Sequence, residues 1–223
     1  MRKSIVWGIV LLMASSLFAT GTIGGGIGIP MVSASYSNAA NREGMAMLAG
    51  SLEMHGSNEF ARDGKFGHGI GYSVAFGIGT SDIGVHDSTQ KPFGVSTVLD
   101  CSFGYQGSYQ LSDKDIFFAG FGCSFSMPTI RTRVTASSTT TDTTIHYFLV
   151  GPYVELGSRH AFSSTFTLSY GVTVGYPLFS GINLRSVVKT TGSSTETINT
   201  ASGICSYPKG MTIVPSVSAV FTY

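Results

Sequence analysis

Three ionisable side chains stand at even spacing in the first third of the chain: Glu53, His55 and Glu59, with Ser51 and Ser57 in the same phase. Residues two apart face the same side of a β-strand, so a strand would gather these groups on one face. Histidine with carboxylates can hold a metal ion, and serine beside histidine can form a hydrolytic site. The five histidines stand singly, without the paired spacing of such motifs. We therefore expect no catalytic, metal or cofactor site here, and interpret the group as the lining of a hydrated interior.

Other polar residues share this inward phase in later segments. The expected lumen lining consists of Glu53, His55, Glu59, Asp100, Gln106 and Glu155. On this register His55 is the only basic candidate inside, while the lysines and arginines fall in turns and loops. Unpaired carboxylates in a low-dielectric passage attract cations. An open lumen would therefore carry a small, cation-preferring current, and the competing outcome is a barrel plugged by loop arginine or lysine.

The three cysteines suggest no planned disulfide framework. Cys101 and Cys123 fall on neighbouring expected strands with the same outward phase, and Cys205 falls in the last long link. A bond between Cys101 and Cys123 would need one particular hairpin register, and the odd third cysteine is left over. We expect two buried small apolar residues and one free loop thiol.

Alternation of apolar and polar residues recurs along the whole chain, with a period of two. It predicts eight strands, at residues 22–35, 46–61, 66–79, 95–111, 116–128, 144–156, 163–180 and 211–223. The links alternate in length: the short ones are 62–65, 112–115 and 157–160, and the long polar ones are 36–45, 80–94, 129–143 and 181–210. Pro30, Pro152 and Pro215 fall inside expected strands, where each removes a ladder donor, so bulges or strand ends are expected there.

The composition narrows the class of protein. Only 11% of the residues are charged and 43% are hydrophobic, whereas soluble domains carry about 25% charged residues. Beyond residues 1–21 no segment approaches the run of about 18 apolar residues that a membrane helix needs. The 29 glycines disfavour long helices. Nearly balanced charge gives no basic face for nucleic acid. The fold class predicted is all-β, a transmembrane eight-stranded antiparallel barrel.

The two ends of the chain fit that class. Arg2 and Lys3 precede an apolar stretch at residues 5–13 and small residues up to Ala19, which is the pattern of a cleaved signal peptide. We expect residues 1–21 to be removed and residues 22–223 to form the barrel. Residues 213–223 alternate apolar and polar side chains and end on Phe221 and Tyr223, as a lipid-embedded barrel strand would.

These features together resemble the small eight-stranded outer-membrane barrels, which include the opacity-type, OmpA-type and OmpW-type proteins. The residues that carry the resemblance are the glycine-rich first strand at residues 24–30, the three short turns, the four long links and the terminal aromatic. The resemblance implies a bacterial outer-membrane protein with both termini and the short turns in the periplasm. It implies outer-membrane lipid and the outer-membrane assembly machinery as partners, with Phe221 and Tyr223 as the assembly signal.

Two functions remain open on this evidence. A lumen lined by small residues favours a narrow channel for small or apolar solutes, resembling OmpW-type proteins. The alternative is a non-conducting structural or adhesive surface protein that meets a host surface ligand through its four long links. An eight-stranded barrel is too narrow for a general porin. The chain has no convincing catalytic triad, so we do not expect an enzyme.

Overall fold

The computed structural model describes residues 20–38, 41–85, 93–136, 138–190, 196–206 and 209–222. These residues form eleven β-strands. None of the described residues forms a helix long and apolar enough to cross a membrane. The strands are β1 Thr20–Gly28, β2 Met31–Asn38, β3 Asn41–Asp63, β4 Phe66–Val85, β5 Phe93–Gln110, β6 Asp115–Ala136, β7 Thr139–Ala161, β8 Phe166–Gly175, β9 Phe179–Thr190, β10 Glu196–Ser206 and β11 Lys209–Thr222.

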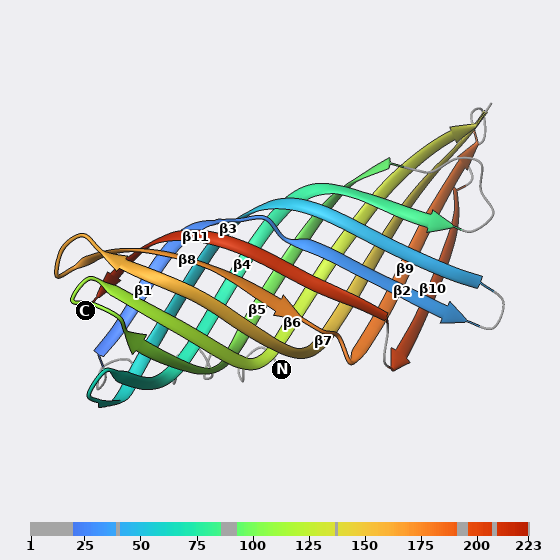
Figure 1. The fold of residues 1–223 in the computed structure, drawn as a ribbon. Coiled ribbons are helices and arrows are strands. Elements are labelled where there is room, and N and C mark those ends of the chain that lie inside the picture. The colour runs from blue at the N-terminus through green and yellow to red at the C-terminus, as the bar shows by residue number, and fades with distance from the viewer. Residues whose placement is uncertain are drawn as a thin grey trace, which may run out of the picture.

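Eight of these strands close an antiparallel ring, which confirms the predicted fold class. The order around the ring is β1, β3, β4, β5, β6, β7, β8 and β11, and β11 pairs with β1 to complete it. The three short turns and the end of β11 lie together at one end of the barrel, here called the turn end (Figure 1). The opposite end is called the extended end. The signal peptide lies outside the described residues and stays a prediction.

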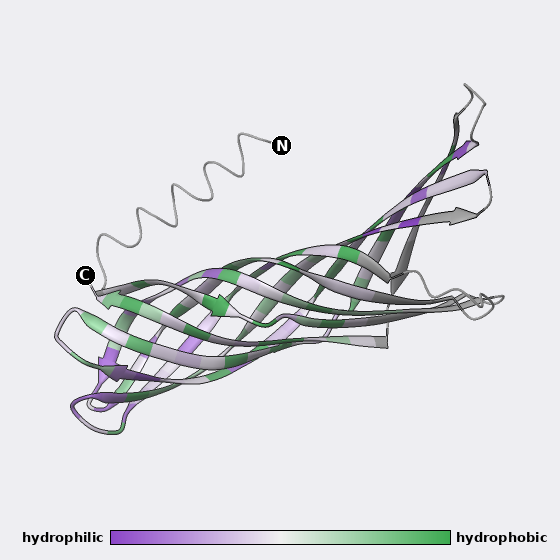
Figure 2. Ribbon diagram, turned by 90° about the horizontal axis from the view of Figure 1, so that it is seen from above, coloured by the Kyte–Doolittle hydropathy of each residue, from purple (hydrophilic) through white to green (hydrophobic). Residues whose placement is uncertain are grey.

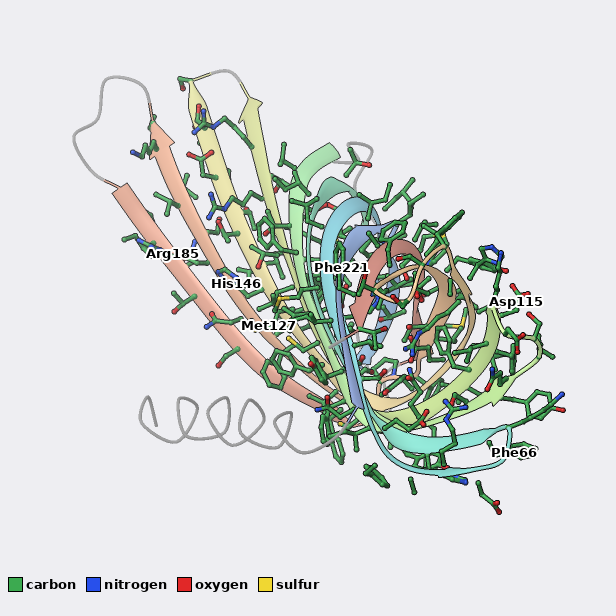
Figure 3. The ribbon with its side chains drawn as sticks, turned by 90° about the vertical axis from the view of Figure 1, so that its left-hand side faces the viewer. Phe66, Asp115, Met127, His146, Arg185 and Phe221 are labelled. Atoms are coloured by element: carbon green, nitrogen blue, oxygen red, sulfur yellow. The ribbon has the colours of Figure 1, made fainter. Side chains whose placement is uncertain are left out.

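Strands continue beyond the ring at the extended end, where long loops were expected. β2 continues the course of β1 and pairs with β3 and β11, while β9 continues β8 and pairs with β7 and β10. The distal parts of β6, β7, β9 and β10 form a sheet that leaves the ring (Figure 3), here called the extension. Its threonine-rich segments were wrongly expected to be loops. Threonine is β-branched and favours strands, and hairpin pairing satisfies the backbone there.

Side chains alternate between the two faces of the ring as predicted. Large apolar side chains face outward, for example Leu52 and Phe121, which are 72% and 61% exposed. Figure 2 shows hydrophobic segments along the body of the barrel and hydrophilic ones at the turn end. Gly24, Gly26 and Gly28 face inward on β1, where a Cβ atom would collide with β11 or with the side chain of Glu53. Small inward residues therefore let the strands approach one another closely.

The third short turn differs from the prediction by five residues. Residues 157–160 were expected to form it, but β7 runs on to Ala161 and the turn is formed by residues 162–165. Ser163 defines this turn, because its Oγ accepts hydrogen bonds from the backbone N–H groups of Thr165 and Phe166. Serine favours turns for this reason. The longer β7 carries Arg159 into the barrel wall with its side chain inside.

Each of these three prolines, Pro30, Pro152 and Pro215, lies in a strand break or directly opposite a break in the neighbouring strand. Pro30 lies in the break between β1 and β2, as expected. Pro152 and Pro215 lie within continuous strands, so the expectation of bulges or ends is wrong for these two. The Pro152 carbonyl accepts from Tyr176 N in the break between β8 and β9, and the Pro215 carbonyl accepts from Ile29 N in the other break. A strand residue directs N–H and C=O to the same side. Each missing donor therefore faces a break in the neighbouring strand.

Candidate functional site in the barrel interior

A small polar cavity lies in the middle of the barrel and has a volume of about 50 Å³. Glu53 and His55 reach it from β3, Asp100 from β5 and Glu155 from β7. These four residues were predicted to line the lumen, and the structure brings them together around one space, here called the carboxylate chamber. A buried water needs roughly 10–15 Å³ of such space, so the chamber has room for a few waters and no larger solute.

The chamber is rich in polar atoms and poor in direct contacts between them. Ser126 lies beside Asp100, and Ser51 and Ser216 lie beside Glu53. Nevertheless Glu53 Oε1 and both carboxyl oxygens of Asp100 make no direct hydrogen bond of good geometry to protein. Buried polar groups are normally satisfied by protein or by ordered water. The chamber is therefore built for hydration rather than for tight side-chain pairing.

Arg159 closes the interior on the turn side of the chamber. Its side chain is only 9% exposed. Its Nη1 donates to Ser57 Oγ over 3.2 Å and its Nη2 to Gln106 Oε1 over 3.0 Å, while the guanidinium lies 4.7 Å from the centroid of the Phe118 ring. Gln106 in turn donates to Glu155 across 3.4 Å. This group of Ser57, Gln106, Phe118 and Arg159, here called the arginine layer, leaves a space of only about 20 Å³.

Arg159 corrects the predicted charge of the interior. The prediction had His55 as the only inward basic candidate and left the inward carboxylates without basic partners. The structure places the guanidinium of Arg159 between Glu155 and Glu59, close enough for both carboxylates to attract it electrostatically. The sequence does contain the signal, because Arg159 continues the inward phase of Tyr153, Glu155 and Gly157. Gly157 and Ser158 are residue types that favour turns, so Arg159 was assigned to a turn instead of to the strand.

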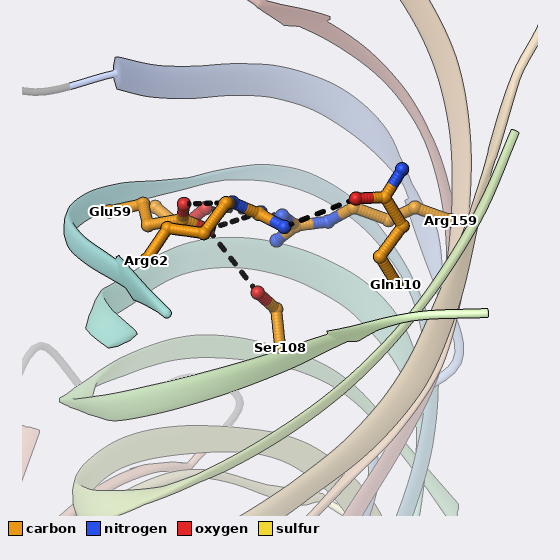
Figure 4. Close-up of polar contacts among 6 residues, drawn as sticks. Glu59, Arg62, Ser108, Gln110 and Arg159 are labelled. Atoms are coloured by element: carbon orange, nitrogen blue, oxygen red, sulfur yellow. Dashed lines mark hydrogen bonds and ion pairs between the residues drawn. The ribbon is translucent and has the colours of Figure 1, made fainter. Parts of the chain in front are cut away.

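Glu59 lies nearer the turn end, apart from the chamber. Arg62 binds both of its carboxylate oxygens, at 2.6 and 2.7 Å, and Ser108 donates to it over 3.3 Å. Arg62 also reaches Gln110 at 3.5 Å, and Arg159 lies close by (Figure 4). The register shift in β3 between Glu59 and Ala61 sets this geometry. The mouth at the turn end is therefore bridged by polar side chains.

A packed apolar layer closes the interior on the other side of the chamber. Inward side chains of five strands meet there and are almost fully buried, and two partly buried side chains of a sixth strand, β9, pack against them. They are Val32, Met45, Met47, Ala49, Val98, Ile130, Ile145, Tyr147 and Leu149, with Ile182 and Leu184 packed against them. Interiors of this kind are close-packed and leave few voids as large as a water molecule. The carboxylate chamber thus lies between an apolar layer and an arginine layer.

The remaining predicted residues lie on the outer face or outside the described residues. Phe221 faces outward on β11, next to Phe166 at a ring-centroid distance of 5.8 Å. Tyr223 lies outside the described residues, and the assembly role of both stays a prediction. Cys101 and Cys123 are free, because Cys101 pairs with Phe125 and Cys123 with Phe103, which sets the two thiols diagonally apart. Cys101 is half-buried and Cys123 is exposed, so the expectation that both are buried is wrong, because their strand phase places them on the outer face. Cys205 belongs to β10 rather than to a loop, and its side chain is outside the described part.

The hydrolytic and metal interpretations find no geometric support in the described residues. Ser57 shares its hydroxyl with Thr22 and Arg159, not with His55. Within the described ranges no group of three or more histidine, cysteine, aspartate or glutamate side chains is arranged to hold a metal ion. The chemistry that the interior offers is hydration, charge and close packing.

This chain is related to known proteins through its fold and not through its sequence. No family model matches the sequence, and no curated protein sequence matches it. A major outer membrane protein from Thermus thermophilus superposes with a TM-score of 0.53 at 10% identity, over 88% of this chain and 99% of that one. This likeness, together with the closed ring and its apolar outer face, defines the class: an outer-membrane β-barrel.

Two other solved structures superpose over a similar length. The attachment invasion locus protein Ail of Yersinia pestis has a TM-score of 0.47 at 9% identity and covers 92% of this chain and 99% of its own. Neisserial surface protein A has a TM-score of 0.46 at 9% identity, with 91% and 97% covered.

Proposed function

We propose that this protein is a surface protein of the bacterial outer membrane whose barrel does not conduct and whose extension carries the contact surface. The observation that carries this proposal is the double closure of the lumen, by the apolar layer on one side of the chamber and by Arg159 on the other. Of the two functions left open by the sequence, close packing favours the non-conducting one.

The outward face of the extension supplies the chemistry of contact. Arg131, Thr144 and Arg185 are neighbours across β6, β7 and β9, so the two arginines stand two strand spacings apart, roughly 10 Å. His146 lies one step nearer the ring and bonds with Thr129 at 3.0 Å. His146 and Arg185 are visible on the extension in Figure 3. Basic and hydroxyl groups on one face suit an anionic ligand.

The carboxylate nearest to this basic surface, Asp142, is already paired with another arginine. Asp142 binds Arg133 through two contacts, of 2.6 and 3.1 Å. The hydrogen bond from Arg133 lowers the pKa of Asp142, so this carboxylate stays ionised and committed to Arg133. Arg131, Arg185 and His146 are exposed on the same face. On the expected orientation this surface stands outside the cell.

Binding to heparin, a sulfated polysaccharide, tests the proposed contact surface. Cells displaying the wild-type protein are compared with the double variant Arg131→Gln/Arg185→Gln and with Lys65→Gln/Lys114→Gln, which removes two charges at the turn end. We expect salt-sensitive retention of the wild type and of the turn-end variant, and its loss in Arg131→Gln/Arg185→Gln. Equal loss in both variants, or no retention by the wild type, would contradict the proposal.

A second candidate is passage of small apolar solutes, the channel role suggested by the sequence. The pairing at the extended end favours it, because no pair joins β10 to β11 among the described residues. An apolar solute would have to displace packed side chains such as Met47 and Tyr147. Faster entry of toluene into cells making the wild-type protein, reduced by Ile130→Asn, would favour this candidate over the first.

A further inference from the structure

The outer wall of the barrel contains a hollow near the turn end. Its volume is about 680 Å³, within the range of roughly 300–1,000 Å³ that is typical of ligand pockets. It spans β4, β5, β6 and β7 on the face directed away from the lumen. We name it the aromatic hollow. It is lined by Phe66, His68, Tyr105, Gly107, Tyr109, Phe117, Ala119, Phe121, Val154 and Leu156, with adjoining parts of Gly67, Ser108, Gly120 and Glu155.

The register of the strands explains why the wall is hollow there. Gly107 and Ala119 face each other across β5 and β6 and form the floor. The flanking pairs on the same face are Tyr105 with Phe121 on one side and Tyr109 with Phe117 on the other. Two small residues between two rows of aromatic rings leave a depression about one side chain deep. His68 on β4 and Leu156 on β7 close its two ends.

The walls of the aromatic hollow are ordered by contacts among the rings. Tyr105 and Phe121 have ring centroids 5.4 Å apart, and Phe66 and Tyr109 are 4.8 Å apart. Aromatic pairs at such distances stabilise each other beyond the area they bury. The hollow is therefore a shaped feature of the surface.

One end of the hollow is polar although it faces the lipid side. His68 Nδ1 and the Tyr105 hydroxyl form a hydrogen bond, which leaves Nε2 of the ring for another partner. Lys65 precedes Phe66 in the turn between β3 and β4, and its carbonyl accepts from Gln110 N at 2.9 Å, which ties this turn to the end of β5. Lys114 belongs to the next turn. Asp63 and Asp113 lie in or beside the same turns, and Asp115 is bound by His160 and Ser112.

We propose that the aromatic hollow binds one phospholipid, with an acyl chain on the floor of Gly107 and Ala119 and the phosphate end at His68 and Lys65. The lining is apolar where the chain would lie, and His68 and the Tyr105 hydroxyl supply hydrogen-bonding groups at one end. Lys65, three residues before His68 in the adjoining turn, supplies the positive charge. The site faces the medium in which phospholipids are most abundant. Its place at the turn end assigns the lipid to the leaflet next to the short turns, which is the periplasmic leaflet on the expected orientation.

Native mass spectrometry of the full chain, delipidated in detergent and titrated with dioleoylphosphatidylglycerol, tests the proposal. The wild-type protein should retain one lipid with distinctly higher affinity than the rest. Gly107→Leu should weaken that adduct about tenfold or more. A Cβ at Gly107 meets its neighbours only at ordinary contact distances, from 3.6 Å, so the variant should fold. Heat-modifiable mobility on gels checks folding in every variant.

Gly50→Leu is the matched control, because it adds the same side chain to the outer face of β3, where a Cβ meets nothing within 4 Å. It should leave the adduct unchanged. The double variant His68→Gln/Lys65→Gln should lose the preference for phosphatidylglycerol over dioleoylglycerol, which has no phosphate. Equal adducts in the wild type and Gly107→Leu would overturn the proposal. A dimer that Gly107→Leu abolishes would assign the hollow to a second copy of the chain and would overturn it as well.

Discussion

Arg159 is the residue on which closure at the turn side depends. Its guanidinium is buried, donates to Ser57 and Gln106 and lies over the ring of Phe118. Arg159→Ala should lower the free energy of unfolding by about 3–5 kcal/mol, because it leaves the remaining buried polar groups without their charged partner. Urea unfolding in lipid vesicles, followed by heat-modifiable mobility, measures this.

Arg62→Ala is the matched control for Arg159→Ala. Arg62 also binds a carboxylate, but its side chain is 36% exposed. Loss of an exposed ion pair costs about 0–1 kcal/mol. If the two variants lose the same small amount, Arg159 does not hold the arginine layer together.

Asp115 gives the barrel a pH dependence at the turn end. The hydrogen bond from His160, and then that from Ser112, lowers the pKa of Asp115 below its ordinary value of 3.8. A lowered carboxyl pKa stabilises the fold above the unfolded pKa and loses that effect as the pH falls through the folded pKa. Asp115→Asn should therefore melt at a lower temperature than the wild type at pH 7. The difference should shrink as the pH falls below about 4. A gap that stays constant as the pH falls through the acidic range would contradict this.

Residue spacing reveals which side chains face inward but not how they are paired. Glu53, His55, Asp100 and Glu155 share the inward phase that a strand requires, and the structure brings them to one chamber. Arg159 escaped prediction because the glycine and serine before it resemble a turn. Nor could spacing alone indicate that Asp115 and His160, 45 positions apart, hydrogen-bond across β6 and β7.

Among the elements, β1 shows how closure of the ring depends on side-chain size. A Cβ at Gly26 would fall on the Ser218 side chain and the Val217 carbonyl of β11, whereas a Cβ at Gly25 would meet only the Glu53 carbonyl at 3.7 Å. Gly26→Val should therefore cost at least 1–3 kcal/mol, the usual range for overpacking, and reduce ring closure. Gly25→Val should be tolerated. The heat-modifiable fraction of refolded protein measures closure, and equal yields from both variants would count against the β1–β11 packing.

Strand periodicity predicts the ring well and the extension poorly. Inside the ring, lipid on one face and a packed interior on the other enforce a clean alternation. In the extension one face carries the row Arg131, Thr144 and Arg185, and the other face carries the row Thr132, Thr143 and Ser186. The apolar period therefore disappears while the hydrogen-bonded ladder continues. Turn positions fail for a related reason, because Ser163 and Gly157 have similar turn propensity and only pairing across β7 and β8 decides between them.

At the scale of the whole molecule, closure separates the two functions that the sequence left open. Pattern alone indicated a lumen with small and acidic residues, and from it a cation-preferring passage. The structure fills the same lumen from three sources: inward apolar residues of the extended side, a guanidinium from β7, and a polar bridge between Arg62 and Glu59. Periodicity predicts which face of a strand a residue occupies. Whether inward side chains from opposite walls of the barrel touch one another depends on the curvature of the ring.

Planar-bilayer recording of the purified full-length barrel tests closure most directly. We predict no steady open-channel current for the wild type at either polarity, and no change in Asp100→Asn, because Asp100 lies in a chamber of about 50 Å³ between two packed layers. A steady, cation-selective current that grows with the amount of inserted protein and falls in Asp100→Asn would contradict the account and show that the lumen is an open passage.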